Sequence, residues 1–139
     1  MTSRESSRNH GLKSQLLRGL ILALALGLSG NAAAGEVSRA VFTTEIDERE
    51  PVAIVDSVDS SSNKSISFFT ELNNMSGQKV THQWTHLDKI MFEKTFEVKA
   101  ERWRVWTSKT LIPSWTGTWT VNVLDDEREL LTSKSFEYR

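Results

Sequence analysis

The chain has no cysteine in 139 residues, and it has only two prolines and three histidines. Without cysteine it can form neither a disulfide framework nor a thiolate zinc site, two devices that stabilise small domains. The fold must therefore be held together by a packed core. A domain of roughly a hundred residues can form one, because folding buries about 65% of the surface that its unfolded chain exposes.

Long apolar runs are also missing. The longest, residues 20–28 (LILALALGL), is short of the ~20 residues that a helix needs to cross a bilayer. A basic leader precedes it, with Arg4, Arg8, Lys13 and Arg18. Ala32 and Ala34 follow it and fit the A-x-A pattern of a cleavage site. This layout predicts a signal peptide over residues 1–34. The alternative is an uncleaved anchor, because residues 19–35 are apolar or small throughout.

Cleavage after Ala34 would leave one domain, residues 35–139, in the periplasm or outside the cell. No cysteine follows the cut, so a lipid anchor of the bacterial lipoprotein kind is excluded, and no membrane span would remain. This domain has 13 Lys and Arg against 17 Asp and Glu, a net charge of 13 − 17 = −4. Charges of both signs are mixed along it. The basic stripe of a nucleic-acid-binding protein is absent from the sequence, which argues against nucleic-acid partners.

The dominant pattern of the domain is alternation of apolar and polar residues with period two, interrupted by turn residues every eight to twelve positions or so. No window has the sustained spacing of an amphipathic helix. We therefore predict an all-β domain. The expected strands cover residues 39–46, 52–58, 65–72, 79–86, 90–98, 102–111, 118–124 and 130–138.

Seven or eight short strands in one domain predict two antiparallel sheets packed face to face. An immunoglobulin-like β-sandwich is the expected architecture. In such sandwiches a tryptophan on the third core strand often lies at the centre of the core. Trp84, in VTHQW, is in the right place in the sequence to be this residue. A small closed barrel is the alternative fold.

The strand at 102–111, RWRVWTSKTL, carries two tryptophans, two arginines and a lysine. Alternation places Trp103 on one face and Arg102, Arg104 and Trp106 on the other. Burying two unpaired guanidiniums would cost far more than exposing one indole, so Trp103 should face the core. We therefore expect Trp106 on the outer surface, with Arg104 close enough for its cation to lie over the ring.

The neighbouring strand would extend this outer surface. In such sandwiches the fifth strand pairs with the second, here residues 65–72, which would bring Phe69 and Glu71 to the same face. An aromatic and charged patch would result. The alternative is a cross-strand ladder that only stiffens the sheet, with arginine stems covering the rings.

Several segments of the domain form a distinctive set: RAVFTTEI with EREP, FFTEL, VTHQWTH, RWRVWTSKTLIPSWTGTWTV and the closing SFEY. Together they resemble the bacterial family of domain of unknown function 2914, over residues 39–138. The resemblance implies an exported bacterial domain, alone behind a signal peptide or attached to membrane segments. It implies no activity, ligand or site.

Candidates for metal binding are few. His82 and His86 are four residues apart on a strand, roughly 13 Å, which is too far to share one ion. Asp56 and Asp59 lie near serines, but their spacing lacks the alternating oxygen pattern of a calcium loop. We interpret that segment as a solvated turn. We therefore predict no metal site and no cofactor, with His82 hydrogen-bonded near the core and His86 in a turn.

Catalytic patterns are equally sparse. The sequence has no G-x-S-x-G nucleophile elbow and no glycine-rich phosphate loop. Its acidic residues gather at 45–50 (EIDERE) and 125–129 (DDERE), which we interpret as solvated turns. We therefore predict no catalytic residues. A small hydrolase with carboxylate or histidine catalysis is the alternative, and an inward-facing His82 would count against it.

We expect a non-catalytic interaction module of the cell envelope that binds a glycan or a protein. The candidate binding residues are Phe69, Glu71, Arg102, Arg104, Trp106 and Trp115. A glycan would stack its sugar rings on Trp106 and Trp115. A protein would use the aromatic and arginine surface, or would add a strand at an open sheet edge. A structural spacer domain would share these sequence features and would differ only in its partner.

Overall fold

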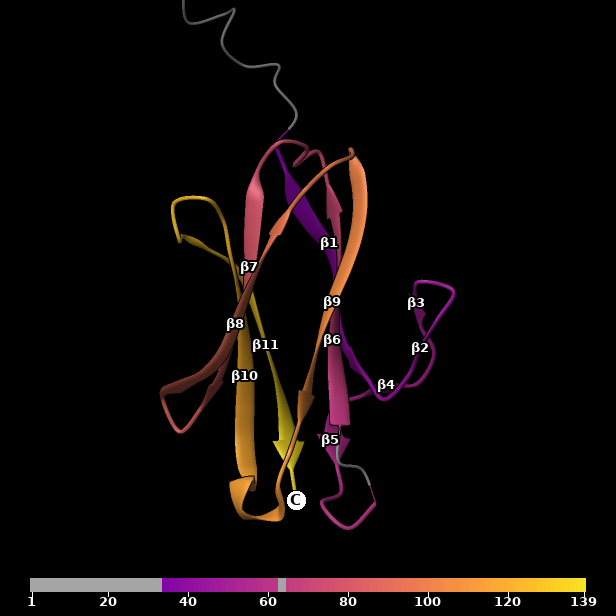
Figure 1. The fold of residues 1–139 in the computed structure, drawn as a ribbon, viewed down its shortest axis with the longest axis vertical. Coiled ribbons are helices and arrows are strands. Elements are labelled where there is room, and N and C mark those ends of the chain that lie inside the picture. The colour runs from indigo at the N-terminus through magenta and orange to yellow at the C-terminus, as the bar shows by residue number, and fades with distance from the viewer. Residues whose placement is uncertain (1–33, 63–64) are drawn as a thin grey trace, which may run out of the picture. The chain divides into compact units, whose positions relative to one another are not determined.

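The computed structural model of the protein describes residues 34–62 and 65–139 (Figure 1). Residues 34–139 form one compact unit. The predicted signal peptide lies outside the described residues except for Ala34. Within the described ranges no helix is long and apolar enough to span a membrane. The regular elements there are strands, apart from one short 3-10 helix, η2 (Pro113–Trp115), as the all-β prediction requires.

Seven strands of eight or nine residues carry the fold. They are β1 (Glu36–Thr43), β6 (Ser65–Asn73), β7 (Lys79–His86), β8 (Lys89–Glu97), β9 (Arg102–Thr110), β10 (Gly117–Leu124) and β11 (Leu130–Tyr138). Four strands of two residues lie between β1 and β6 in the sequence. These are β2 (Ile46–Asp47), β3 (Glu50–Pro51), β4 (Ile54–Val55) and β5 (Ser57–Val58).

The long strands form two facing sheets. The first sheet has the order β4-β1-β6-β9, the second has the order β5-β11-β10-β7-β8, and β2 and β3 form a separate hairpin. Among the described strands every pair is antiparallel except β5 with β11. Figure 1 shows two layers, with the β2–β3 hairpin beside the first sheet. The predicted immunoglobulin-like sandwich is confirmed, and the alternative of a closed barrel is wrong.

The core is built from the inward residues of both sheets, as alternation predicts. Its buried members include Ile66, Phe68 and Leu72 of β6, Val80 and Trp84 of β7, and Trp119, Val121 and Val123 of β10. Trp84 lies among the rings of Phe42, Phe68 and Phe136, with centroid separations of 6.0, 6.5 and 6.3 Å and edge-on geometry. Such edge-to-face contacts are favourable for aromatic rings. The central position predicted for this tryptophan is confirmed.

A chain of hydrogen bonds crosses this core between the two sheets. Trp84 Nε1 donates to Thr107 Oγ1 of β9 at 2.8 Å, and Thr107 Oγ1 lies 3.0 Å from His82 Nδ1. On the other side of the imidazole, His82 Nε2 lies 2.9 Å from Thr70 Oγ1 of β6. Thr70 in turn donates to the carbonyl oxygen of Val105 at 3.3 Å. The chain therefore joins β7 to both β6 and β9.

The directions of these bonds fix the protonation state of His82. Thr107 Oγ1 already accepts the indole proton, so its own hydroxyl proton can be donated to His82 Nδ1. Thr70 donates its proton to a carbonyl, so it accepts from His82 Nε2–H. Every donor is satisfied when His82 is neutral with its proton on Nε2. Burial acts in the same direction and lowers the pKa of His82 to about 3.

The second histidine differs from its predicted position. His86 is the last residue of β7 rather than a turn residue, and it is buried. Its ring stacks on Trp119 with centroids 4.6 Å apart, and its Nε2 lies 2.9 Å from the carbonyl oxygen of Thr116. The turn begins one residue later, at Leu87 and Asp88, which both have positive φ.

The buried imidazole predicts how stability depends on pH. Its pKa in the folded chain lies well below the value of about 6.5 in an unfolded chain, so protonation favours unfolding. The free energy of unfolding should be highest above pH 6.5 or so. It should fall as the pH drops from about 6.5 towards 3, by up to roughly 1.4 kcal/mol per pH unit. Denaturant titrations between about pH 7.5 and 5 measure this slope.

The matched variant is His82→Gln, whose side chain can form hydrogen bonds but does not titrate. It should be less stable than the parent at neutral pH, and its profile should be flat in that window. The carboxyls of Glu50 and Glu71 do not interfere there, because their pKa values lie below the ordinary value of 4.5. A parent profile as flat as that of the variant would contradict a neutral, buried His82.

Candidate functional site

Five of the six predicted site residues come together on the outer face of the first sheet. β6 and β9 pair antiparallel, with Phe69 opposite Trp106 and Glu71 opposite Arg104. Arg102 precedes Arg104 by two residues and shares its face. The strand pairing expected from the sequence is therefore confirmed, and it places these side chains next to one another.

A β-hairpin that the sequence analysis missed lies against this face. It consists of β2 and β3, joined by Glu48 and Arg49, whose φ angles are 49° and 63°. Positive φ at both central residues is what the type I′ turn of a two-residue hairpin requires. The interpretation of residues 45–50 as a solvated turn is therefore wrong in part, because the segment turns back and brings Glu50 onto the sheet.

Glu50 joins the hairpin to the sheet through two arginines. Its carboxylate accepts hydrogen bonds from Arg39 Nη1 and Nη2 at 2.7 and 3.0 Å, and from Arg104 Nη1 at 2.6 Å. These bonds, the ones from Arg39 most strongly, lower the pKa of Glu50 to about 2. The same contact raises the pKa of Arg39. The carboxylate is therefore charged throughout the physiological range, between two guanidiniums.

Glu71 is the second carboxylate of this face, and it is 9% exposed. Its oxygens accept from Arg39 Nη2 at 3.1 Å, from Arg102 Nε at 2.8 Å and from Ser38 Oγ at 3.0 Å. The hydrogen bond from Arg39 is the largest influence that lowers the pKa of Glu71. Arg39 therefore bridges both carboxylates and links the hairpin to β6.

The cluster of charged side chains at the centre of this face is positive. It is formed by four guanidiniums and two carboxylates, a net charge of 4 − 2 = +2: Arg39, Arg49, Arg102, Arg104, Glu50 and Glu71. In the described part of the chain Arg49 has no carboxylate within ion-pair distance. Its guanidinium donates to Arg104 O at 3.2 Å and lies 5.9 and 5.7 Å from the ring centroids of Trp103 and Trp106. Arg49 is thus a cation held on aromatic rings and a backbone carbonyl.

The aromatic side chains are less exposed than the sequence predicts. Phe69 faces outward yet is 0% exposed, and the Arg39 guanidinium lies over its ring, 4.9 Å from the centroid. Trp106 is half-buried and nearly parallel to Phe69. The cation over Trp106 is that of Arg49 rather than Arg104 as expected, because Arg104 is engaged by the hairpin carboxylate.

Trp115 is separate from these five residues. It belongs to η2, in the connection between β9 and β10, and it packs half-buried against the core. Its carbonyl oxygen accepts from Trp119 Nε1 at 2.9 Å, and Lys109 Nζ lies 4.9 Å from its ring centroid. Its contacts therefore close one end of the core and do not add a ring to the outer face of β6 and β9.

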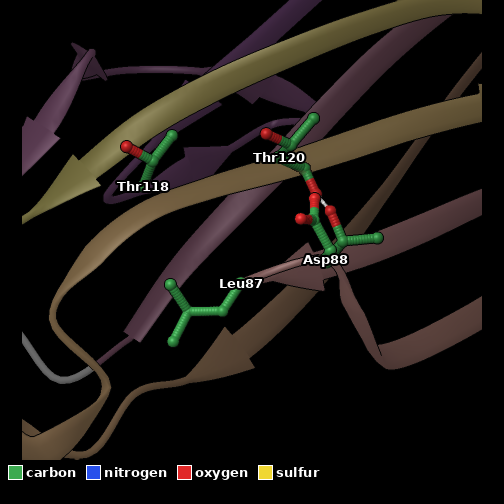
Figure 2. A pocket seen from close by; sticks show the side chains of 5 residues that line it. Leu87, Asp88, Thr118 and Thr120 are labelled. Atoms are coloured by element: carbon green, nitrogen blue, oxygen red, sulfur yellow. Dashed lines mark hydrogen bonds between the residues drawn. The ribbon is translucent and has the colours of Figure 1, made fainter.

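A second surface feature is a hollow of about 270 Å³ beside the turn between β7 and β8. Figure 2 shows Thr118 and Thr120 of β10 with Leu87 and Asp88 of that turn. Its lining includes one carboxylate, that of Asp88. His82 lies elsewhere and faces the core. Among the described residues no cluster of His, Asp and Glu could hold a metal ion.

The two sheets define an immunoglobulin-like β-sandwich, and a solved structure shares this fold. An immunoglobulin-like protein from Pseudomonas aeruginosa matches with a TM-score of 0.53 at 13% sequence identity, over 79% of this chain and 100% of that chain. Residues 77–138, which contain β7 to β11, match the model of the family described as Protein of unknown function (DUF2914). Over these residues the chain resembles the DUF2914 family, and the resemblance predicted from the sequence is confirmed there.

The two comparisons differ in what they cover. The family match does not extend to residues 39–76, so β1, the hairpin and β6 lie outside it. At 13% identity the structural match shows the fold alone. No curated protein matches the chain. The comparisons therefore assign no chemistry to the outer face of β6 and β9.

Glu50→Gln tests how the hairpin is held. Loss of the charge should weaken both arginine contacts, so the amides of residues 46–50 should exchange faster in hydrogen–deuterium exchange. The midpoint of global unfolding should change little, because partly exposed ion pairs contribute little to stability. The control is Glu48→Gln, in the same turn, which removes an exposed acid that forms no ion pair in the described residues. Equal exchange in both variants would contradict this anchoring.

Proposed function

We propose that the chain is a non-catalytic interaction module of the cell envelope that binds a protein partner through the outer face of β9. One observation carries this function: four arginines and two half-buried tryptophans gather around a single strand, and three of the arginines share two carboxylates as ion-pair partners. Tryptophan and arginine are the side chains that most often dominate the energy of protein interfaces. The periplasmic or secreted location rests on the signal-peptide pattern of residues 1–34.

The geometry favours a protein over a glycan. Sugar rings stack on free aromatic faces, whereas Trp106 already contacts the Arg49 guanidinium and Phe69 is covered. Trp115, the other ring considered for a glycan, lies in a different part of the domain. Guanidiniums that are only partly neutralised suit carboxylates and backbone carbonyls, which every protein surface offers.

A non-catalytic role is supported by the placement of the titratable groups. His82 is neutral, buried and fully hydrogen-bonded, so it has no free nitrogen for a substrate. The shifted acids Glu50 and Glu71 are held in the charged state by arginines rather than poised near neutral pH.

The test is a pull-down from cell envelopes with the full chain, read for both protein and polysaccharide. Arg102→Gln removes a guanidinium whose side chain is 61% exposed, and Glu71 keeps its contact with Arg39. Arg128→Gln, in the turn between β10 and β11, is the matched control, because the Arg128 side chain is 56% exposed and pairs with Glu93. Trp106→Ala completes the set, and circular dichroism confirms that each variant is folded.

We expect the parent chain and Arg128→Gln to retain the same protein. Arg102→Gln and Trp106→Ala should retain roughly tenfold less, as expected for the loss of one central contact. Equal retention by all four folded forms would place the binding surface elsewhere. Retention of polysaccharide in place of protein would contradict a protein partner and would show that the ligand is a glycan.

A further inference from the structure

The four edges of the two sheets differ in how they are protected. β4 and β5 end their sheets with only two residues each, so most of β1 and of β11 is unpaired on that side. The pairings of β1 with β6 and of β11 with β10 both contain a register shift. β8 is long, but its pairing with β7 shifts register between Trp84 and Thr85, and it places Lys94 opposite the buried His82. Register shifts and inward-side charges are devices that prevent a further strand from pairing. β9 has nine residues and no proline, and its pairing with β6 has no register shift.

The paired side of β9 carries the backbone groups of its odd-numbered residues. The carbonyl oxygen of Glu101, just before the strand, accepts from Asn74 N at 2.7 Å, and that of Val105 accepts from Thr70 Oγ1 at 3.3 Å. Both donors lie on the β6 side. Because backbone groups alternate in direction along a strand, those of residues 101, 103, 105 and 107 point towards β6.

The even-numbered residues therefore direct their backbone groups to the unpaired edge. Arg104 confirms this, since its carbonyl oxygen accepts from Arg49 Nη2, outside the sheet, at 3.2 Å. Trp106 and Ser108 follow with the same orientation. In the part of the chain that the structure describes, neither has a backbone hydrogen-bond partner on that edge. This edge thus offers free N–H and C=O groups at regular spacing.

The hydrogen bond from Arg49 is the kind that an added strand would supply to the same carbonyl. Arg49 also lies over Trp103 and Trp106, which flank the edge from the inner and the outer face of the sheet. A strand beside β9 would direct successive side chains to these two faces in turn. The two indoles would then contact its alternate residues, and Arg49 would be released to meet an anion.

The charge around this edge selects the incoming strand. Arg49, Arg102, Arg104 and Lys109 surround it, and β9 itself contains no acidic residue. The exposed acids of the hairpin, Asp47 and Glu48, form no hydrogen bond or ion pair with β9 in the described residues. An incoming segment with carboxylates would be attracted, and a basic one would be repelled.

We propose that an extended, acidic segment of a partner protein adds to the free edge of β9 as a further strand. Its backbone pairs with Trp106 and Ser108, and its carboxylates meet Arg49 and Arg102. Its apolar side chains contact the two tryptophans. This inference rests on the proposed function, and it specifies the kind of protein segment that the same surface binds.

Two other occupants of the edge are disfavoured by charge. A second copy that pairs β9 with β9 in antiparallel fashion would bring Arg102 and Arg104 towards Lys109 of the other copy. The leader of this chain, residues 1–34, has four basic residues and one acid, so it is repelled as well. Neither repulsion applies to an acidic segment of another protein.

The probe is a short peptide in which glutamate alternates with valine, titrated against the full chain by tryptophan fluorescence. A peptide with lysine in place of glutamate tests the charge. A peptide with proline in place of valine keeps the charge but cannot form the ladder, because proline has no N–H and resists pairing. We expect the glutamate–valine peptide to bind about tenfold or more tightly than either control. It should also slow amide exchange at Trp106 and Ser108.

Variants of Ser108 test the edge from the side of the protein. Ser108→Pro removes the N–H on the free edge, and proline is tolerated at such positions. Ser108→Ala keeps that N–H and removes only the hydroxyl, which lies 2.6 Å from Ser67 Oγ. We expect the proline variant to lose at least about tenfold in peptide affinity and the alanine variant to match the parent. Thermal melting shows whether the proline variant folds. If it does not, the test is amide exchange at Trp106 and Ser108 of the parent, measured with each of the three peptides. Strand addition requires slower exchange with the glutamate–valine peptide alone.

The outcomes separate this inference from the proposed function. Equal binding of the proline-containing acidic peptide would mean attraction by charge alone and would overturn strand addition. If no peptide binds while an envelope protein is still retained by the parent and lost by Arg102→Gln, the strand-addition inference fails and the proposed function stands. If no peptide binds and no envelope protein is retained, the strand-addition inference and the proposed function both fail.

Discussion

The hydrogen-bond chain through His82 is the constraint on which the rest of the structure depends. It joins β7 of one sheet to Thr70 of β6 and Thr107 of β9 in the other, inside an otherwise apolar core. Each member has a partner of the required kind, which is the condition under which a buried polar chain stabilises a fold. A shift of β9 by one residue would take Thr107 away from both His82 and Trp84 and leave two buried polar groups unpaired. The register of β9 is therefore strongly specified.

The same register decides what the outside of the sheet presents. Side chains alternate along a strand, so with Thr107 directed inward, Arg104 and Trp106 are directed outward. The guanidiniums on that side are neutralised only in part, by Glu71 of β6 and by Glu50, which the hairpin brings from another part of the chain. The surface charge is thus a consequence of core packing. The edge of β9 stays open because the hairpin meets it through a side chain, that of Arg49, and not through a strand.

Alternation in the sequence was enough to predict the sandwich, the central Trp84 and the neighbours that β6 and β9 bring together. The hairpin could not be predicted in this way. Its turn needs two residues with positive φ, and the usual signal is Asn-Gly or Asp-Gly, whereas here Glu48 and Arg49 adopt that conformation. Without the hairpin, neither the cation over Trp106 nor the Glu50 ion pairs could be foreseen. The burial of Phe69 was missed for a related reason, because the direction of the long Arg39 side chain is set by the two carboxylates it reaches.

The central proposal for this molecule is that β9 is the place where the chain meets its partner. Hydrogen–deuterium exchange of the full chain, with and without the envelope material that it retains, tests this most directly. We predict slower exchange confined to β9 and the β2–β3 hairpin, with the amides of Trp106 and Ser108 among those affected, because they face the free edge. Slower exchange along β8 or at the turn between β7 and β8, with β9 unchanged, would contradict it.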